Sequence, residues 1–322
     1  MFELGSVLDR LGQPAAAMSA FAQAKRQIRE SPGSQAFSGA SFLERVTRNR
    51  AWFTQDRLRA TAARAAPAAP LGPVFFVGFP RSGTTLMERV LQAHPGVVTT
   101  EEASPLTPLR RQLSFDGPYP EGLASLTADD IDRATRLFWS SAEEAVGPLD
   151  GRILVDKLPL NIVDLGLANI VFPQARVLVA LRDPRDICLS CFMQYFLLND
   201  AMVNFLDLRQ TARTYAAVMD LWLHYREILT LPYREYRYED LIEDFDGIVR
   251  QALDFIGVGW HEEVTRYREK SLGRAINTPS YRHVTGALYS RAVGRWRAYR
   301  RELAPVLEEL KPFAAALGYP ED

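Results

Sequence analysis

The residues best placed to do chemistry form a short loop at 78–85, which reads Gly-Phe-Pro-Arg-Ser-Gly-Thr-Thr. A buried apolar strand is predicted over 74–77 and a helix over 86–91. A loop between such elements binds anions through its backbone N–H groups and the positive end of the helix. The form that binds nucleoside triphosphates, G-x-x-x-x-G-K-[ST], uses its lysine to reach the terminal phosphates. Here Thr84 takes the place of that lysine and Arg81 puts a cation inside the loop. We therefore expect an anion other than a conventionally bound nucleoside triphosphate.

A second anion site is predicted directly after an apolar strand at 177–181. Arg182 leaves the end of that strand, and Ser190 follows eight residues later on a predicted helix. Asp183 stands before a proline, a pattern typical of a helix cap with proline at the first helical position. Arg182 and Ser190 could grip a phosphate by charge and hydroxyl together. The alternative is that Arg182 pairs with Asp183 or Asp186 in a surface network.

With both motifs in view, the chain resembles the sulfotransferases that use 3′-phosphoadenosine-5′-phosphosulfate (PAPS). The resemblance covers about 72–300. It is strongest to protein-tyrosine sulfotransferases and to bacterial proteins that join tetratricopeptide repeats to such a domain. It implies that the first motif binds the 5′-phosphosulfate and that Arg182 and Ser190 bind the 3′-phosphate. The first-motif residues are Arg81, Ser82, Gly83, Thr84 and Thr85.

The stretch 93–102 matches the same branch of the family in order and length, and the resemblance puts Glu102 at the position of the catalytic base. A phenol with a pKa of about 10 must lose its proton as it attacks sulfur, and a positioned carboxylate can accept that proton. Related small-molecule enzymes use a histidine, but His94, the nearest in sequence, precedes a proline and is better read as part of a capping turn. The alternative for Glu101 and Glu102 is a solvated acidic pair.

The resemblance also assigns residues to the leaving side of the reaction. Lys157 ends a predicted strand, and a lysine at this place neutralises charge on the bridging oxygen as the sulfuryl group departs. The alternative is a simple ion pair between Lys157 and Asp156. Ser280 matches a serine near the donor phosphates and the reacting centre. The resemblance implies catalytic roles for Arg81, Glu102, Lys157 and Ser280.

Two further positions match the donor site, and one departs from it. Tyr238 matches a tyrosine that contacts the donor. Arg295 stands where the tyrosine-specific enzymes have lysine. Gln194, four residues after Ser190, replaces an arginine of those enzymes. This loss weakens one phosphate contact and leaves the acceptor class more open than the donor.

The elements that position these residues alternate along the chain, which predicts an α/β fold: a P-loop-type, mostly parallel sheet flanked by helices, with a short N-terminal helical segment. In such sheets ligands bind beyond the carboxyl ends of the strands. Strands are expected at 74–78, 97–100, 153–156, 176–181 and 233–237. Helices are expected at 84–93, 127–145, 159–170, 184–197, 209–229, 246–257 and 299–316.

Residues 1–66 are expected to be a helical segment, and 67–322 the sulfotransferase domain. Small residues, Leu and Phe at helical spacing in 1–30 resemble part of a tetratricopeptide repeat. A second helix is expected over 40–60, followed by an Ala- and Pro-rich linker at 60–70. One repeat cannot bury its own apolar face, so it must pack on the main domain or belong to a longer array.

Composition excludes several classes of partner. The net charge is −1 and the pI is near 6.5, which gives no electrostatic reason to expect nucleic acid or an anionic membrane. No apolar run reaches membrane-spanning length, and no secretory signal opens the chain, so we expect a cytoplasmic protein; a homodimer is left open. Two cysteines in a C-x-x-C, Cys188 and Cys191, are expected to be packed thiols, because a zinc site would need more ligands than this chain groups together.

These observations predict in-line transfer of a sulfuryl group from PAPS to a hydroxyl, without a metal. A tyrosine in an acidic peptide is the first acceptor by resemblance, and a carbohydrate or other small molecule is the alternative. A P-loop kinase is a rival, but it needs a lysine in the loop and Mg²⁺ ligands. A non-catalytic binding protein is the remaining rival, which nothing beyond the partial repeat supports.

Overall fold

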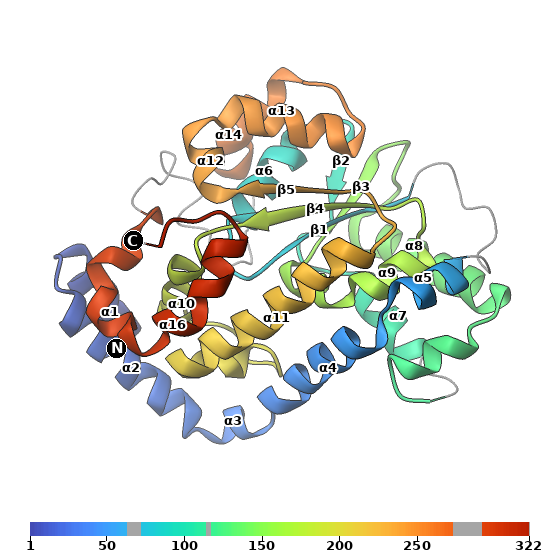
Figure 1. Ribbon diagram of the computed structural model, residues 1–322. Coiled ribbons are helices and arrows are strands. Elements are labelled where there is room, and N and C mark those ends of the chain that lie inside the picture. Colours follow the sequence, from blue (N-terminus) through green and yellow to red (C-terminus); the bar gives the residue numbers. More distant parts are fainter. Residues whose placement is uncertain (63–71, 114–116, 273–291, 322) are drawn as a thin grey trace. The chain divides into compact units, whose positions relative to one another are not determined.

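The computed structural model describes residues 1–62, 72–113, 117–272 and 292–321 (Figure 1). These residues form two compact units. Unit 1 comprises Met1–Thr47, Arg182–Asp220 and Asn277–Asp322, and unit 2 comprises Arg48–Leu181 and Leu221–Ile276. Each unit is described by itself below.

Unit 2 contains a five-stranded sheet in the order β2-β3-β1-β4-β5. All neighbouring strands run parallel. The strands are β1 (Val74–Gly78), β2 (Val97–Thr99), β3 (Ile153–Lys157), β4 (Arg176–Leu181) and β5 (Tyr233–Arg237). The predicted α/β fold with a parallel sheet is thus confirmed, and every predicted strand exists. Parallel pairing brings the carboxyl ends of β1 and β3 to the same edge, with Phe76 opposite Lys157.

The central strand shows why the sequence folds this way. All five residues of β1 are buried, as expected for a parallel strand covered on both faces. The ring of Phe75 contacts those of Phe138 and Phe172, while Phe76 contacts Tyr236. Successive side chains of a strand point to opposite faces, so Phe75 packs against α8 and Phe172 on one face of the sheet, and Phe76 packs against Tyr236 of β5 on the other.

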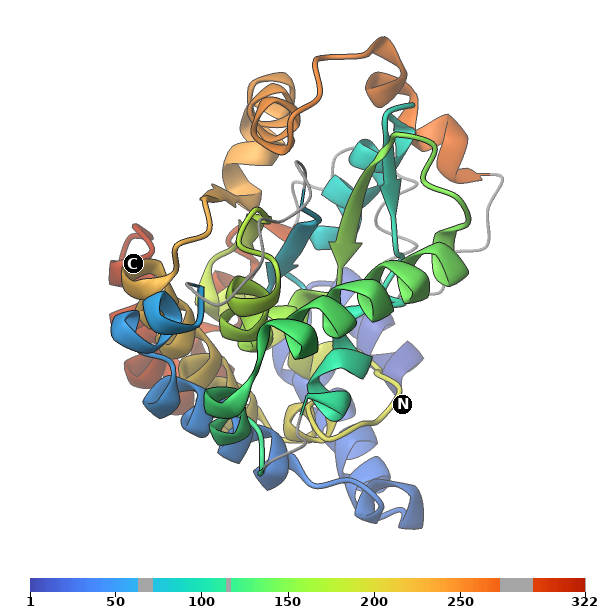
Figure 2. The same ribbon diagram turned by 90° about the vertical axis from the view of Figure 1, so that its right-hand side faces the viewer.

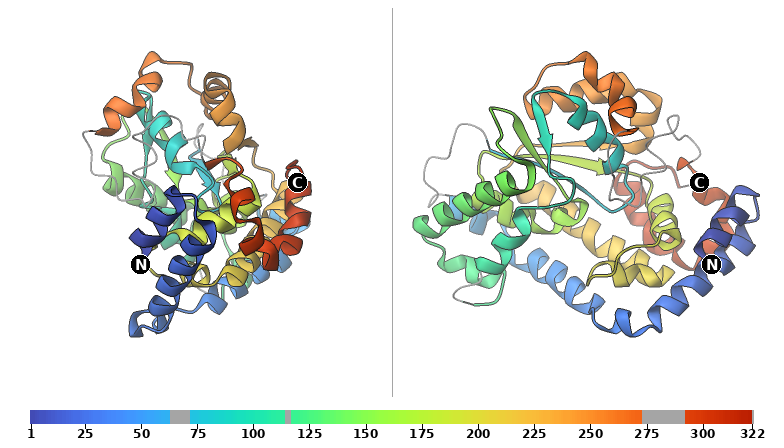
Figure 3. Two further views of the ribbon diagram at one scale, coloured as in Figure 1. Left: turned by 90° about the vertical axis from the view of Figure 1, so that its left-hand side faces the viewer. Right: turned by 180° about the vertical axis from the view of Figure 1, so that it is seen from behind.

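Helices cover both faces of this sheet. On one side lie α6 (Thr84–Ala93), α12 (Tyr238–Glu243), α13 (Phe245–Ile256) and α14 (Tyr267–Leu272). On the other lie α8 (Ala128–Val146) and α9 (Leu165–Val171), preceded by the short helix η2 (Pro159–Asp164). Figures 1 and 2 show α13 and α8 on opposite sides of the sheet. Seen from behind, α6 lies beside β2 (Figure 3, right). The remaining elements of unit 2 are α5 (Gln55–Ala62), α7 (Leu106–Gln112), η1 (Glu121–Ser125) and η4 (Glu262–Arg266).

Unit 1 is helical. Its first two helices, α1 (Phe2–Arg10) and α2 (Pro14–Arg29), pack side by side (Figure 3, left). Gly5 has no side chain, which lets α1 and α2 approach closely: a Cβ at this position would lie 2.8 Å from the ring of Phe21. The other elements are α3 (Pro32–Gln35), α10 (Pro184–Met193), η3 (Met202–Leu206), η6 (Arg295–Tyr299) and α16 (Arg300–Ala316). Two helices, α4 (Gly39–Trp52) and α11 (Leu208–Ile228), include residues of both units.

Some element boundaries differ from the sequence prediction. The helix expected over 184–197 ends at Met193, because Gln194 is extended (ψ 138°). The helix expected over 40–60 is two helices, α4 and α5, and that over 159–170 begins as the 3₁₀ helix η2. The linker expected at 60–70 lies mostly outside the described residues, so the boundary near residue 66 stays a prediction. In the part of the chain that is described, no helix is long and apolar enough to span a membrane.

Candidate active site

The predicted phosphate-binding loop joins β1 to α6 at the carboxyl edge of the sheet, and two glycines fix its course. At Gly78 a Cβ would lie 2.6 Å from the carbonyl oxygen of Ala180, so only glycine allows this approach to β4. Gly83 has φ of 94°, and its Cβ would lie 2.4 Å from the ring of Tyr238. The predicted donor-contacting tyrosine is therefore packed against the loop.

The loop offers hydrogen-bond donors to an anion. Thr84 and Thr85 begin α6, and amides in the first turn of a helix have no intrahelical acceptor. Ser82 is fully buried, and its Oγ finds no hydrogen-bonding partner among the described residues. Arg81 has a positive φ of 74°, which is uncommon for a residue with a side chain. A bound anion would supply acceptors for the Ser82 hydroxyl and for the first amides of α6, so the loop fits the anionic group implied by its sequence.

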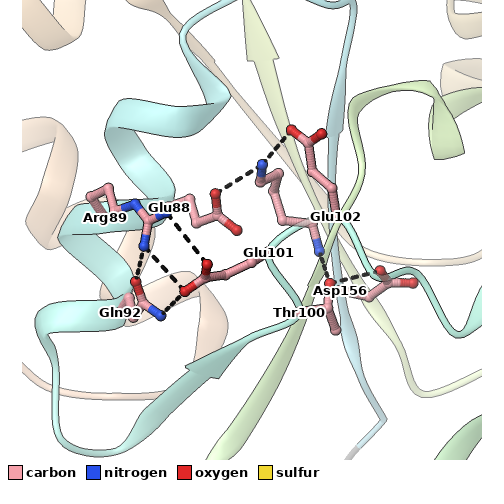
Figure 4. Close-up of polar contacts among 8 residues, drawn as sticks. Glu88, Arg89, Gln92, Thr100, Glu101, Glu102 and Asp156 are labelled. Atoms are coloured by element: carbon pink, nitrogen blue, oxygen red, sulfur yellow. Dashed lines mark hydrogen bonds and ion pairs between the residues drawn. The ribbon is translucent and has the colours of Figure 1, made fainter. Parts of the chain in front are cut away.

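Beside the loop, a buried ammonium group lies between two carboxylates (Figure 4). Lys157, the last residue of β3, has its Nζ 2.6 Å from Oε1 of Glu102 and 2.8 Å from Oε2 of Glu88. The side chains of Lys157 and Glu88 are fully buried, whereas that of Glu102 is 35% exposed. Lys157 thus pairs with these two glutamates and not with Asp156, the alternative considered from the sequence.

The turn that presents Glu102 is strained. Glu101 and Glu102 have φ of 48° and 74°, two successive non-glycine residues in the left-handed region. Such conformations cost on the order of 1–3 kcal/mol each and persist only where the surroundings impose them. Here the Glu102 amide donates to the carbonyl of Lys157 (3.1 Å), and the Ala103 amide donates to that of Thr100 (2.9 Å). The turn therefore ties the candidate base to the strand that carries the lysine.

The two adjacent glutamates have different partners. Glu101 accepts hydrogen bonds from Arg89 (3.1 Å) and Gln92 (2.6 Å), both on α6. Figure 4 shows its side chain turned toward this helix and away from Glu102. The sequence alternative, a solvated pair of glutamates, does not describe this arrangement, because one glutamate holds α6 and the other contacts Lys157.

A buried carboxylate, that of Asp156, is hydrogen-bonded to residues on both sides of the turn that carries Glu102. Asp156 is fully buried and accepts hydrogen bonds from the hydroxyls of Thr100 (3.2 Å) and Ser104 (3.1 Å) and from the side-chain amide of Asn161 (3.3 Å). Burial raises the pKa of Asp156 to about 7, and the hydroxyl hydrogen bonds act in the opposite direction. Successive strand residues face opposite ways, so Asp156 holds the turn while Lys157 contacts α6.

The second predicted anion motif lies in unit 1. Asp183 caps α10 by accepting from the Arg185 amide at 2.9 Å, and proline occupies the first turn, so the predicted cap is confirmed. The guanidinium of Arg182 donates to the carbonyl of Ala292 (2.6 Å) and lies 3.9 Å from Asp186. Burial raises the pKa of Asp186 to about 6, whereas the charge of Arg182 acts in the opposite direction.

Asp186 also fixes the segment that carries Arg295. Its carboxylate accepts from the amides of Gly294 and Trp296, both at 2.7 Å. Arg295 itself contacts Asp9 of α1 at 2.8 Å. Ser190 lies half-buried on α10.

Ser280 lies outside the described residues. The predicted site residues thus form two groups: Arg81–Thr85, Glu102, Lys157 and Tyr238 in unit 2, and Arg182, Ser190 and Arg295 in unit 1. Their union in one donor site stays a prediction.

Glu88 is the site residue that the sequence interpretation missed. It lies on α6, where all residues except Gln92 are buried. A glutamate at an apolar position of this helix indicates a buried partner of opposite charge, because ionised side chains are almost never fully buried unless they are paired. The sequence thus contained a sign of a buried ion pair, but it did not identify the partner.

Among the residues that the structure describes, no group of three or more His, Cys, Asp or Glu side chains is arranged to hold a metal ion. The metal-free reaction stays a prediction. Cys188 and Cys191 are both buried and are not joined in a disulfide, as packed thiols should be. Burial raises the pKa of the Cys188 thiol, so that thiol is not activated.

The family follows from comparison with known proteins. The model of the sulfotransferase family matches residues 73–262, which is more than half of the chain and includes β1, the loop, Glu102 and Lys157. The chain therefore belongs to the sulfotransferase family.

Individual relatives are distant. An uncharacterized protein of Aquifex aeolicus is 30% identical over 77% of this chain and 33% of its own length. Protein-tyrosine sulfotransferase A of Caenorhabditis elegans is 26% identical over 63% of this chain and 54% of its own. Protein-tyrosine sulfotransferase 2 of Gallus gallus is 24% identical over 76% of this chain and 69% of its own. The chain thus spans about a third of the Aquifex protein and about half of the nematode enzyme.

One solved structure with a similar arrangement is the sulfotransferase domain of the Synechococcus PCC 7002 olefin synthase. It is 19% identical and has a TM-score of 0.43, over 73% of this chain and 97% of that domain.

Replacing Gly83 by alanine should destabilise the protein and the loop together. The positive φ alone costs a residue with a Cβ about 1–2 kcal/mol, and the contact with the Tyr238 ring adds to this. Gly151 is a matched control, because it also has a positive φ (77°) but nothing within 4 Å of its Cβ position. In urea unfolding, Gly83→Ala should lower the free energy of unfolding more than Gly151→Ala does. Equal losses would mean that the loop does not pack on Tyr238.

The buried Asp156 should make stability depend on pH. Its pKa is raised in the folded protein, so folding binds a proton between about pH 4 and pH 7. Its contribution to stability is therefore complete below about pH 4 and lost as pH rises to about 7. The Asp156→Asn variant should show a flatter decrease in unfolding free energy across this range. Asp254→Asn changes an exposed position on α13 and should keep the wild-type dependence of the unfolding free energy on pH. If both variants keep that dependence, the raised pKa of Asp156 is contradicted.

Proposed function

We propose that this protein transfers a sulfuryl group from PAPS to a hydroxyl acceptor. The observation that supports this best is the buried Lys157 ammonium, which contacts Glu102. Lys157 lies opposite Phe76 of β1, two residues before the loop begins at Gly78. A cation and a carboxylate base thus adjoin an anion-binding loop that has threonine in place of lysine. Family membership supports the same reaction class.

The donor supplies an activated sulfuryl group next to a good leaving phosphate. The amides of Thr84 and Thr85, the hydroxyl of Ser82 and the charge of Arg81 are the groups of the loop that would bind the 5′-phosphosulfate oxygens. Arg182 and Ser190 would bind the 3′-phosphate, with Tyr238 and Arg295 as further contacts. Ser280 would join them near the reacting centre.

Glu102 accepts the acceptor's hydroxyl proton as the new oxygen–sulfur bond forms. The bond between sulfur and the bridging phosphate oxygen breaks, and its electron pair stays on that oxygen, where Lys157 neutralises the charge. The exposure of Glu102 supports the first of these roles. Glu102 uses Oε1 toward Lys157, and about a third of its side chain is exposed where an acceptor could arrive.

The acceptor class rests on fewer observations. Relatives that are 24–26% identical are named protein-tyrosine sulfotransferases, which favours a tyrosine in an acidic peptide. Gln194 replaces an arginine of those enzymes, so a carbohydrate or small-molecule hydroxyl is the second candidate. The cytoplasmic location and a homodimer stay predictions.

A kinase reaction is less well supported. Asp183, the residue that could mimic a magnesium ligand, instead caps α10 and pairs with Arg185 at 2.7 Å. The loop also lacks the lysine that such enzymes need.

Calorimetry with the desulfonated nucleotide, 3′-phosphoadenosine-5′-phosphate, tests the donor assignment. It should bind more tightly than adenosine 5′-phosphate, and Arg182→Ala should remove that difference. A charged hydrogen bond is worth about 1.5–3 kcal/mol, or roughly ten- to hundredfold in affinity. Tighter binding of ATP–Mg²⁺ would favour a kinase, and equal affinity for the two adenosine nucleotides would exclude recognition of the 3′-phosphate.

Replacing Glu102 by glutamine should abolish catalysis but spare nucleotide binding. Loss of a general base lowers kcat by about 10²–10⁴-fold, whereas the affinity for the desulfonated nucleotide should stay within about twofold because the loop is untouched. Transfer of a labelled sulfuryl group to peptide and glycan panels measures the turnover and identifies the acceptor at the same time.

Glu101→Gln is the matched control, because it removes the adjacent carboxylate, which contacts Arg89 and Gln92. It should retain far more activity than Glu102→Gln. Full activity of the Glu102 variant would show that another group is the base.

A further inference from the structure

Glu88 is a buried carboxylate that no step of the proposed reaction uses. Its side chain is fully buried on the first turns of α6, directly after the phosphate-binding loop. Its Oε2 lies 2.8 Å from the Lys157 ammonium, and its Oε1 has no hydrogen-bonding partner among the described residues. Burial raises the pKa of Glu88, and the nearby Lys157 ammonium acts in the opposite direction. A carboxylate in such a place is costly unless a charge compensates it.

The two carboxylates around Lys157 are not equivalent. Glu102 is 35% exposed on a strained turn, whereas Glu88 is fully enclosed between helix and sheet.

The other charged groups near Lys157 have partners of their own. Arg89 on α6 pairs with Glu101 of the turn, and Asp156 on β3 accepts hydrogen bonds from Thr100 and Ser104. Glu88 is therefore the one fully buried counter-ion of Lys157 in the described part of the chain.

The proposed reaction removes the charge of the other counter-ion. When Glu102 takes the acceptor's proton it becomes neutral, and its attraction to Lys157 is lost. A buried ammonium without a counter-charge carries a penalty of several kcal/mol. Without a second carboxylate, Lys157 would then depend on the charge developing on the leaving oxygen alone, at the step where the ammonium must already be charged and in place. A second carboxylate that takes no part in proton transfer prevents this.

We propose that Glu88 is a positioning residue that keeps Lys157 charged and in place while Glu102 changes its protonation state. This inference rests on the proposed function, because it assumes that Glu102 is the base and Lys157 the cation on the leaving side. Glu88 acts through Lys157 and touches neither donor nor acceptor.

Replacing Glu88 by glutamine preserves the size of the side chain but removes its charge. Both Glu102 and Lys157 should then lose protons at lower pH, since each is less surrounded by negative charge. The whole pH profile of kcat should move to lower pH by about one unit, with kcat at its maximum lowered about tenfold or more. Glu88→Asp should restore the profile in part. Glu144→Gln, an exposed charge change on α8, should leave the profile unchanged.

A purely structural role for Glu88 gives a different result. If Glu88 only fills space between α6 and the sheet, Glu88→Gln should lower activity or thermal stability without moving the pH profile. A profile that stays in place in a folded, active variant overturns the proposal.

A second measurement does not depend on catalysis. The chain has only four lysines (Lys25, Lys157, Lys270 and Lys311), so the ¹⁵N signals of their amino groups can be assigned by single substitutions. Removing the Glu88 charge should lower the titration midpoint of Lys157 by about one pH unit or more. Lys25 serves as an internal reference, because its amino group contacts the carbonyls of Cys191 and Gln194 and burial lowers its pKa to about 8.

The two measurements separate failure of the proposal from failure of the proposed function. If wild-type protein transfers no sulfuryl group, the proposed function fails, and the lysine titration still reports whether Glu88 holds Lys157 charged. If wild-type protein is active but the pH profile of the folded, active Glu88→Gln variant stays in place, the role of Glu88 is refuted, and an unmoved Lys157 titration would confirm that refutation.

Discussion

The candidate site depends on the burial of one positive charge at the end of a sheet strand. Lys157 ends β3 in full burial, where an ammonium is stable only with compensating charge. Two carboxylates supply it, Glu88 from the helix that follows the phosphate-binding loop and Glu102 from the turn after β2. The same ion cluster therefore joins the helix that follows the predicted anion-binding loop to Glu102, the proposed base. Its position is fixed by packing, because both Lys157 and Glu88 lie between α6 and the sheet.

The turn that carries Glu102 adds strain to this arrangement. Two successive residues with positive φ would be unfavourable alone, but backbone hydrogen bonds to Lys157 and the buried Asp156 network hold them. The adjacent Glu101 turns to α6 instead. Backbone strain of this kind is common at functional sites, where a side chain is held in one orientation. This agrees with the role proposed for Glu102. A parallel sheet provides the frame, because its strand carboxyl ends lie at one edge.

Unit 1 uses the same kind of interaction for the second motif. A buried carboxylate, Asp186, binds the amides of Gly294 and Trp296 and lies near Arg182. The Arg185 guanidinium lies 3.9 Å from the centre of the Trp296 ring. These contacts attach the segment of Arg295 to α10. Each half of the proposed donor site is thus organised around charges that are buried and paired within its own unit.

The sequence by itself determined the sheet strands, the position of the loop between β1 and α6 and the cap at Asp183, because each depends on periodicity or spacing over a few residues. It also marked Glu102 and Lys157 as candidates, through the resemblance of their surrounding sequence to that of the sulfotransferases. It did not predict that Glu88 would meet Lys157, nor that Glu101 and Glu102 would turn to different partners. Only the tertiary structure decided these, because the partner of a buried charge depends on which strands are neighbours and on which face of a helix meets them. Residues far apart in sequence acquire that relation through packing alone.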